Sequence, residues 1–142
     1  MNAILFELLS HPDVYEKAKE EVMSVASGND GVISYAEIHN LPYLNAVIQE
    51  ALRLHPGVLS RMARISPEKD MVYHDGKRQK TFVLPAGTPA SMTTLISHTD
   101  PEAFEAPYEY RPQRWIENQK LNRAIIAFSR GSRNCVGQVA PP

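Results

Sequence analysis

Proline positions constrain this sequence more than any other feature, because a proline restricts where a helix can begin and continue. Apolar side chains recur at helical spacing over residues 2–10, and Pro12 then suits the first turn of a new helix over residues 12–26. A stronger apolar stripe predicts another helix over residues 42–54, which the following Pro56 ends. The beginning of the chain is therefore expected to be helical.

Shorter signals mark turns and helix starts. The glycines and polar residues at 28–31 predict a turn. Ser34 and Glu37 have the spacing of a capping box, which predicts a short helix. Asp100 followed by Pro101 can start a helical turn.

The pattern changes toward β-structure after these helices. Residues 71–73 and 81–84 are apolar or aromatic, and they flank a polar segment that contains Asp75-Gly76. This arrangement predicts a hairpin. We expect residues 89–96 to form a third short strand.

Residues 105–124 carry Pro107 and Pro112 and show no regular period, so we expect a long irregular segment there. The chain of 142 residues is long enough for one domain with a real core. Taken together, the patterns predict a mainly α-helical fold with a small β-sheet.

Composition excludes several classes of protein. Fifteen Lys and Arg against 16 Asp and Glu give a net charge of −1, which argues against a nucleic-acid binder. Cys135 is the single cysteine, so one chain cannot build a disulfide framework or a multi-cysteine zinc or iron–sulfur site. No apolar run reaches the roughly 18 residues of a membrane span. Glu7 interrupts the beginning, which therefore does not resemble a signal peptide.

Glu50 and Arg53 form the first candidate constellation. They lie three residues apart on the predicted 42–54 helix, on one side of it and outside its apolar stripe. Taken alone, this pattern is typical of a surface ion pair that contributes little to stability.

The second constellation is the spacing Phe-x-x-Gly-x-Arg-x-Cys-x-Gly near the end of the chain, which comprises Phe128, Gly131, Arg133, Cys135 and Gly137. The glycines permit unusual backbone angles and the close approach of a flat ligand. An arginine two residues before the cysteine favours a thiolate. Five fixed positions have a chance frequency on the order of 10⁻⁶ to 10⁻⁷ per window. A buried structural cysteine does not explain such a pattern.

This constellation resembles the haem-binding signature of the cytochromes P450, and four other segments resemble that family in the family's own order. The five segments are the signature itself (128–137), the Glu-x-x-Arg helix and its His-Pro (46–56), the Pro-Glu-Arg-Phe/Trp segment (111–115), the Pro-x-Gly-Thr turn (84–88) and the His-x-Asp-Pro segment (98–101). Gln113 stands where the family more usually has Glu. Residues 57–116 look most like fungal microsomal members.

The resemblance implies a role for each matching residue of the signature. Cys135 would be the proximal thiolate ligand of haem iron, as in P450 enzymes. Phe128 would shield the sulfur, and Gly131 and Gly137 would lie against the haem. Arg133 would pair with a haem propionate.

The resemblance also assigns residues outside the signature. Arg64 would hold the second propionate, with Arg61 as the less favoured substitute. Glu50, Arg53 and Arg114 would form a buried structural cluster, which is not catalytic.

The implied cofactors are haem b (iron protoporphyrin IX) and NADPH acting through a reductase. The implied activity is the hydroxylation of a small organic substrate with dioxygen, at the cytosolic face of the endoplasmic reticulum membrane. Residues 110–135 carry six Lys and Arg and a single acid, Glu117. We expect this surplus to form a docking face for an acidic reductase.

The resemblance implies that residues 1–142 correspond to the C-terminal part of a P450 domain, so we expect an incomplete P450 fold. The family's membrane anchor and distal oxygen-activating helix precede this part, and a Leu-Ala-x-x-Glu helix follows it. This sequence departs from that pattern after Gly137. The alternative function is therefore a truncated, non-catalytic chain or pseudogene product that binds haem weakly at most.

A third alternative is a cysteine hydrolase, which would pair Cys135 with a histidine. The neighbours of Cys135 match no nucleophile motif, so this alternative is disfavoured. The five histidines are interpreted as loop or helix-end residues, and Trp115 as a packing residue.

Overall fold

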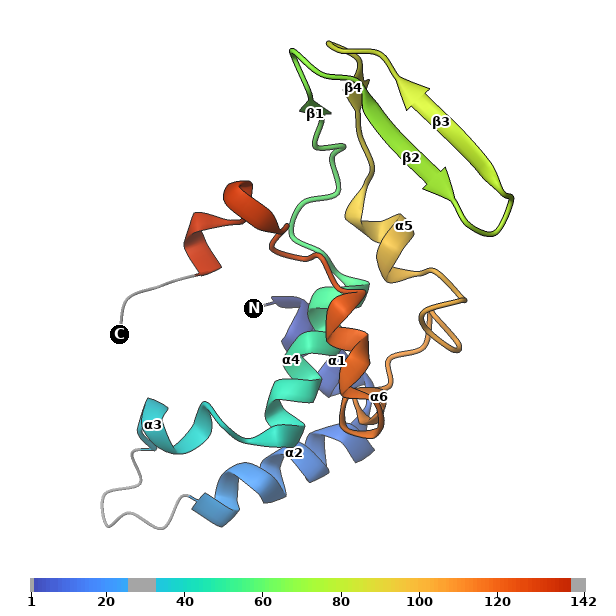
Figure 1. Ribbon diagram of the computed structural model, residues 1–142. Coiled ribbons are helices and arrows are strands. Elements are labelled where there is room, and N and C mark those ends of the chain that lie inside the picture. The colour runs from blue at the N-terminus through green and yellow to red at the C-terminus, as the bar shows by residue number, and fades with distance from the viewer. Residues whose placement is uncertain (1, 26–32, 139–142) are drawn as a thin grey trace. The chain divides into compact units, whose positions relative to one another are not determined.

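The computed structural model describes residues 2–25 and 33–138 of the chain, and Figure 1 shows their elements in chain order. The helices are α1 (Asn2–Ser10), α2 (Pro12–Val25), α3 (Tyr35–Ile38), α4 (Pro42–Leu54), α5 (Thr94–His98) and α6 (Gln113–Glu117). Short 3₁₀ helices cover Gln119–Arg123, Gly131–Arg133 and Val136–Gln138. The strands are β1 (Arg64–Ile65), β2 (Met71–Asp75), β3 (Lys80–Leu84) and β4 (Pro89–Ala90).

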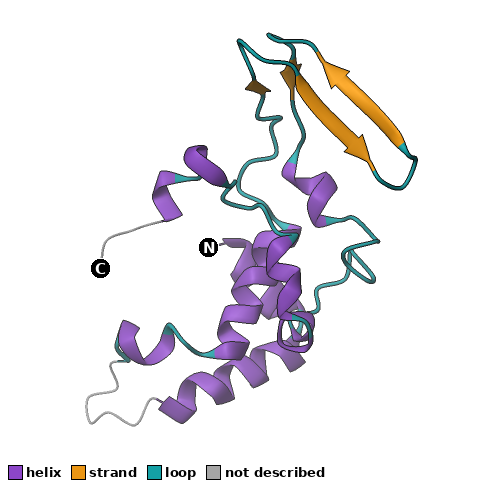
Figure 2. Ribbon diagram, in the orientation of Figure 1, coloured by secondary structure: helices purple, strands orange, loops and turns teal. Residues whose placement is uncertain are grey.

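The chain divides into two compact units, which Figure 2 distinguishes by their secondary structure. One unit, here called the helical unit, comprises Met1–Val58 and Thr94–Pro142. The other, here called the strand unit, comprises Leu59–Thr93 and contains all four strands.

Helix α4 is the centre of the helical unit, because it packs against α1, α2, α5 and α6. One apolar cluster joins it to α2 through Val14, Ala18, Val47, Ala51 and Tyr110. A second cluster, on another side of α4, consists of Ala46, Phe104 and Trp115. A helix buried on several sides explains why α4 carries both apolar and charged residues in its interior-facing positions.

The strand unit consists of two separate antiparallel pairs. Strand β2 pairs with β3, in a register that places Tyr73 opposite Phe82. These two aromatic rings stack with their centroids 6.3 Å apart. The short β1 pairs with β4, Arg64 opposite Ala90.

Several predicted elements are confirmed. The helices expected over 2–10 and 42–54 have those bounds, and the helix expected from residue 12 extends to the last described residue before the gap. The hairpin forms, and so does the capping box between Ser34 and Glu37. The turn expected at 28–31 lies outside the described residues.

The third strand expected over residues 89–96 is wrong. Only Pro89–Ala90 is extended, and it pairs with β1 instead of extending the hairpin. The following residues form α5, because buried Thr94 donates a hydrogen bond to the Val58 carbonyl (3.0 Å) and His98 is completely buried. These tertiary contacts outweigh the β-propensity of the segment.

The segment expected to be irregular over residues 105–124 is also partly helical. Helix α6 and the 3₁₀ helix at Gln119–Arg123 both lie in it. Trp115 and Arg114 bury one side of α6, which stabilises a helix that is too short to be stable alone.

Candidate functional site

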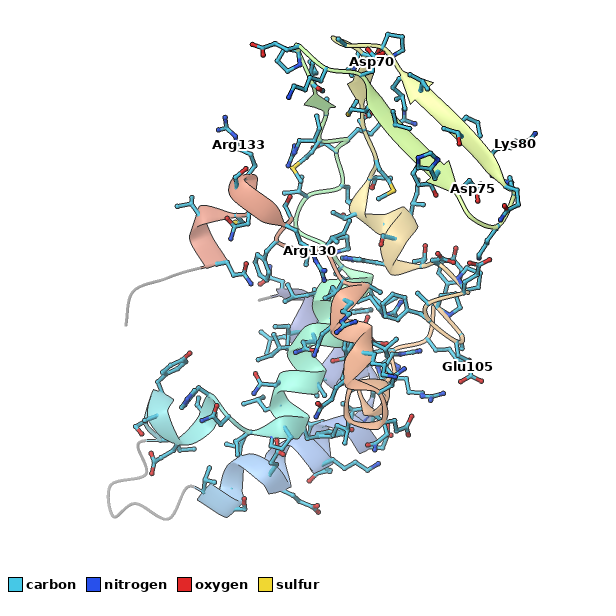
Figure 3. The ribbon with its side chains drawn as sticks, in the orientation of Figure 1. Asp70, Asp75, Lys80, Glu105, Arg130 and Arg133 are labelled. Carbon is cyan, nitrogen blue, oxygen red and sulfur yellow. The ribbon has the colours of Figure 1, made fainter. Side chains whose placement is uncertain are left out.

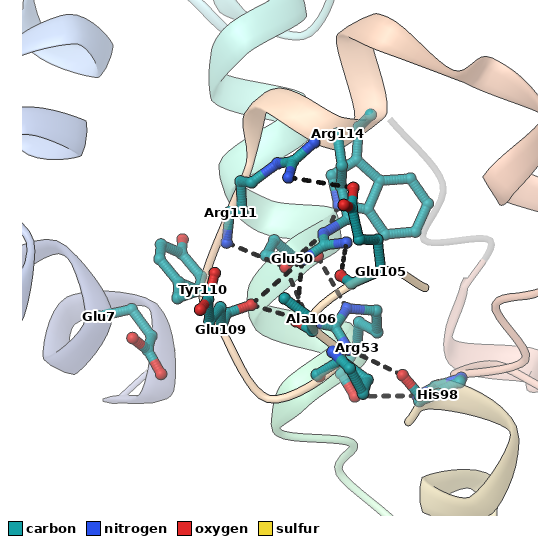
Figure 4. Close-up of polar contacts among 12 residues, drawn as sticks. Glu7, Glu50, Arg53, His98, Glu105, Ala106, Glu109, Tyr110, Arg111 and Arg114 are labelled. Atoms are coloured by element: carbon teal, nitrogen blue, oxygen red, sulfur yellow. Dashed lines mark hydrogen bonds and ion pairs between the residues drawn. The ribbon is translucent and has the colours of Figure 1, made fainter. Parts of the chain in front are cut away.

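Glu50 lies at the centre of a buried polar cluster on α4, with no exposed surface (Figure 4). Its Oε1 accepts hydrogen bonds from Arg53 Nη2 (2.8 Å), Arg114 Nε (3.0 Å) and the Arg111 backbone N–H (3.0 Å). Its Oε2 accepts from Arg53 Nε (2.8 Å) and Trp115 Nε1 (2.9 Å). The cluster therefore joins α4 to α6.

All three nitrogen atoms of the Arg53 guanidinium group donate hydrogen bonds. Besides its two bonds to Glu50, Nη1 donates to the carbonyls of His98 (2.8 Å) and Pro107 (2.6 Å), and Nη2 donates to the Glu109 carbonyl (3.1 Å). The ring of Phe104 lies 5.0 Å from the guanidinium carbon. Arg53 thus fixes the path of the chain on both sides of that phenylalanine.

Arg114 gives the cluster a second cation. Its Nη1 donates to the Glu105 carbonyl (2.6 Å), and its Nη2 donates to those of Ala106 (3.3 Å) and Glu109 (3.4 Å). Two guanidinium groups face one carboxylate, and backbone carbonyl dipoles offset the remaining positive charge. The Glu50–Arg53 pair is therefore an interior link between elements. The buried cluster that the resemblance implied is present, whereas the surface ion pair favoured by the helix pattern alone is wrong.

Cys135 lies on the exposed loop that follows residue 127, between two 3₁₀ turns. Its backbone N–H donates to the Phe128 carbonyl (2.8 Å), which closes the loop on itself. Gly131 has φ +76°, a conformation that favours glycine. A Cβ built on Gly137 would lie 3.7 Å from Cys135 Sγ, an ordinary van der Waals contact, so Gly137 lies next to the sulfur.

A cavity of about 620 Å³ adjoins this loop. Gln49 and Leu52 of α4 line one side of it, and loop residues line the other; these are Phe128, Ser129, Arg130, Gly131, Asn134 and Gln138, together with Asn122, Ile125 and Ala127 of the preceding segment. The lining combines apolar, amide and cationic groups. Such a mixture suits a ligand that has both an apolar body and an anionic edge.

Comparison with known proteins identifies the family. The cytochrome P450 family model matches residues 1–139. The chain belongs to the cytochrome P450 family.

Individual P450 relatives support this assignment. The chain is 40% identical over 137 residues to the cytochrome P450 monooxygenase TRI4 of Trichoderma arundinaceum, and 36% identical over 140 residues to the fusicoccadiene C-8 hydroxylase of Phomopsis amygdali. It is 38% identical over 140 residues to the cytochrome P450 monooxygenase tndB of Aspergillus flavipes. These matches cover 94–96% of this chain and 25–28% of the relatives, so the chain spans about a quarter of their length.

The loop residues fit the haem that the P450 family implies. A cysteine thiolate is a soft ligand suited to iron, and Cys135 is exposed on a loop held by its own backbone hydrogen bond. Other residues of the same loop, among them Phe128, Arg130 and Asn134, line a cavity with aromatic, cationic and amide groups. The donor chemistry is that of a thiolate-ligated haem, and the exposed sulfur is accessible to a ligand.

The arginines assigned to the haem propionates lie in different units. Arg133 is exposed in the Cys135 loop, and Figure 3 shows its side chain extending from that loop. Arg64 is an exposed residue of β1 in the strand unit. Arg61, which precedes β1 in the same unit, is also exposed. The helical unit alone therefore brings together Cys135, Phe128, Arg133 and the two glycines of the signature.

His98 is a site residue that sequence reasoning missed. It is indeed at a helix end, but it is completely buried and hydrogen-bonded through both ring nitrogens. Burial lowers its pKa, and the nearby Arg53 charge acts in the same direction. The His-x-Asp-Pro segment was the available signal, but a sequence does not show which groups a histidine will meet.

Tyr110 is another buried titratable group that the sequence did not single out. Its hydroxyl donates to the Val47 carbonyl (3.0 Å) on α4. Burial raises its pKa, and the carboxylates of Glu7 and Glu50 add to the effect. It is a neutral packing residue at any physiological pH.

Proposed function

We propose that this chain provides the haem-ligating part of a P450 monooxygenase, with Cys135 as the proximal thiolate ligand. The observation that carries this proposal is an exposed cysteine on a closed loop whose neighbouring residues line a mixed cavity, in a chain of the P450 family. When bound, haem supplies the activation of dioxygen that hydroxylates the substrate.

The chain's own residues bind and shield the haem in this proposal. Phe128 lies beside the cavity and limits water access to the sulfur. Gly131 and Gly137 let the backbone approach a flat ligand. Arg133 pairs with one propionate. The resemblance assigns the other propionate to Arg64, which belongs to the strand unit.

Glu50, Arg53 and Arg114 take no part in proton transfer in this proposal. All their polar groups are already engaged with each other, with Trp115 and with backbone atoms. Their role is to fix α4 against the segments that lead to the Cys135 loop.

We further propose that a small organic molecule is the substrate and that electrons come from NADPH through a reductase. The relatives include a fusicoccadiene hydroxylase, which is consistent with an apolar substrate. By family, the cytosolic face of the endoplasmic reticulum membrane is the proposed location. Among the residues that the structure describes, no helix has the length and apolar character needed to cross a membrane.

Haem titration of the 142-residue chain tests the ligand assignment. We expect the reduced, CO-bound complex to show the absorption spectrum of thiolate ligation in the wild type and in Ser132→Ala, a control in the same loop. Cys135→Ser should lose that spectrum. The proposal fails if the wild type lacks it or if Cys135→Ser retains it. A thiolate spectrum without NADPH-dependent turnover by the haem-loaded chain would favour the non-catalytic alternative.

The excess of basic residues at 110–135 supports a docking face for an acidic reductase. Arg114 is internal and Arg111 pairs with Glu117 (2.9 Å) and Glu105 (3.5 Å), so they do not contribute to that face. The exposed cations that remain are Lys120, Arg123 and Arg130, since Arg133 is assigned to a haem propionate.

Charge reversal tests this docking face. The double variant K120E/R123E should slow reduction of the haem-loaded protein by a reductase several-fold at low ionic strength, and salt should diminish the difference. Lys17→Glu, an exposed reversal on α2, is the matched control and should leave the rate unchanged. Equal rates in K120E/R123E and the wild type across the salt range would exclude this face.

A further inference from the structure

His98 connects three segments of the helical unit through hydrogen bonds. Its Nδ1 lies 3.0 Å from the Arg53 carbonyl oxygen at the end of α4, and its Nε2 lies 2.9 Å from the Ile126 backbone nitrogen. Its own carbonyl accepts a hydrogen bond from Arg53 Nη1 (2.8 Å). With no exposed surface, the imidazole cannot exchange these partners for water.

These partners determine the tautomer of His98. The Ile126 backbone N–H can only donate, so Nε2 must carry a lone pair. The Arg53 carbonyl can only accept, so the ring proton must be on Nδ1. A doubly protonated ring would direct an N–H at another N–H in a buried site, beside the Arg53 guanidinium. The geometry therefore requires a neutral Nδ1–H imidazole.

Ile126 begins a short series of backbone bonds that leads to Cys135. The Ile126 carbonyl accepts a hydrogen bond from the Ser129 N–H (2.9 Å), which closes a tight turn. Phe128, inside that turn, accepts from the Cys135 N–H (2.8 Å). The position of Ile126 thus determines where the cysteine loop begins.

A second bond from α5 holds the same segment. Ser97 Oγ donates to the Ala124 carbonyl (3.2 Å), two residues before Ile126. Helix α5 is itself attached to the segment that follows α4, through the hydrogen bond from Thr94 to the Val58 carbonyl. The side chains of Ser97 and His98 therefore hold residues 124–126 against α5.

We propose that His98, as a neutral Nδ1–H imidazole, is a positioning residue for Cys135: it links the end of α4 to the backbone from which the cysteine loop starts. A misplaced loop would present the sulfur at a wrong distance and angle to a metal, so the link affects ligation and not only stability. The positioning role rests on the proposed function, whereas the hydrogen-bonded link does not.

Two isosteric variants separate the two ring nitrogens. In His98→Gln the side-chain oxygen reaches the place of Nε2 and can still accept from Ile126. In His98→Asn the side-chain amide takes the place of Nδ1, so it can still donate to Arg53 but cannot reach Ile126. Both variants remove the imidazole but keep the bond from Arg53 Nη1 to the carbonyl of residue 98, so only His98→Gln retains a connection from α4 to Ile126.

The first measurement uses the full 142-residue chain without haem. The nitrogen NMR shifts of His98 should show a protonated Nδ1 and an unprotonated Nε2 at neutral pH. In His98→Asn the amide protons of Ile126 and Cys135 should exchange with solvent about tenfold faster or more, the usual effect of losing a buried hydrogen bond. In His98→Gln they should stay close to the wild-type rates. The proposal is overturned by an Nε2–H or charged ring, or by equal exchange in the two variants.

A control separates positioning from general loss of stability. Tyr110→Phe also removes a buried hydrogen bond to α4, but the apolar cluster that Tyr110 joins contains none of residues 124–135. It should accelerate exchange throughout the helical unit without a selective effect on Ile126 and Cys135. A selective effect equal to that of His98→Asn would contradict the proposal.

The last measurement is the spectrum of the reduced, CO-bound haem complex. His98→Gln should keep the thiolate form, and His98→Asn should shift a larger fraction to a form without thiolate ligation. If the wild type binds no haem through Cys135, the proposed function fails, and the tautomer and exchange data still decide whether the link exists. If the wild type shows thiolate ligation and both variants retain it equally, the positioning role fails alone.

Discussion

Glu50 shows why single residues matter so much in this chain. Its carboxylate has no exposed surface, and it accepts five hydrogen bonds from four residues. A buried carboxylate is stable only when its charge is paired and its lone pairs are used. Removing any one donor therefore leaves an incompletely satisfied charge in the interior, and the partners have to be treated as a unit.

Arg53→Lys tests how much the planar guanidinium contributes. Lysine keeps the charge but cannot reproduce the paired bonds to Glu50 together with three bonds to carbonyls. We expect the free energy of unfolding, measured by urea denaturation, to fall by about 3–5 kcal/mol. Arg111→Lys is the control, because its ion pairs are solvent-exposed, and its effect should stay below about 1 kcal/mol. Similar losses in the two variants would mean that burial of the pair is unimportant.

The burial of His98 predicts how the stability of the chain depends on pH. Burial lowers the pKa of His98 in the folded chain; the hydrogen bond to the Arg53 carbonyl acts against this, and the Arg53 charge, itself paired with Glu50, adds to the lowering. Below the unfolded value of about 6.5, the unfolded chain gains a proton at this residue that the folded chain does not. Stability should therefore fall as pH decreases from 7 to 5, and this part should be absent in His98→Gln. Denaturation curves with the same pH slope in both proteins would contradict it.

At the scale of elements, α4 begins in an unusual way. The residue before it, Leu41, has no side chain that can cap the helix, although Pro42 suits its first position. The Glu21 carboxylate of α2 accepts hydrogen bonds from the backbone N–H groups of Tyr43 (2.9 Å) and Leu44 (2.8 Å) instead. A negative charge at this N-terminal end also interacts favourably with the positive end of the helix dipole.

Glu21→Ala should therefore destabilise the chain by about 1 kcal/mol, the usual effect of losing an N-terminal cap. Glu20→Ala is the matched control, since Glu20 is the exposed neighbour on the same helix. Glu20→Ala should change the free energy of unfolding by only a few tenths of a kcal/mol, so its thermal unfolding midpoint should stay close to that of the wild type. If both alanine variants unfold at the same temperature, Glu21 does not act as a cap.

Sequence patterns predicted the elements whose signals are local. The bounds of α4 follow from an apolar stripe between two prolines, and the hairpin follows from two apolar runs around a turn. Helix α5 was predicted as strand, because its helical form depends on bonds from Thr94 and His98 to residues far away in sequence. The sequence could not show these bonds, nor the cap that Glu21 provides from another helix.

The candidate site likewise has features that local sequence patterns predicted and features that they did not. The spacing around Cys135 is local, so the loop residues could be named from the sequence. The burial of Glu50 and Arg53 was not visible in the helix pattern alone, which favoured a surface pair, and it was expected only from the resemblance to the P450 family. The link through His98 was not expected at all, because it joins residues 28 and 45 positions apart.

At the scale of the whole molecule, burial is unevenly distributed between the two units. All buried residues that the structure describes belong to the helical unit. In the strand unit, Val72, Tyr73, Phe82 and Val83 are each between 45% and 60% exposed. A two-stranded hairpin with so little buried surface is marginally stable in water. The two units should therefore differ in how easily they open.

Hydrogen exchange of the 142-residue chain measures this difference. Amides that pair β2 with β3 should exchange through local opening, with a free energy near zero, while the central amides of α4 exchange only with global unfolding. Tyr73→Ser, which removes the ring stacked on Phe82, should accelerate exchange in the hairpin and leave α4 unchanged. Its control is Tyr35→Ser, an exposed aromatic of α3 stacked on His39, which should not affect the hairpin. If hairpin and α4 amides share one exchange free energy, the chain unfolds as a single cooperative unit, and the uneven burial has no energetic consequence.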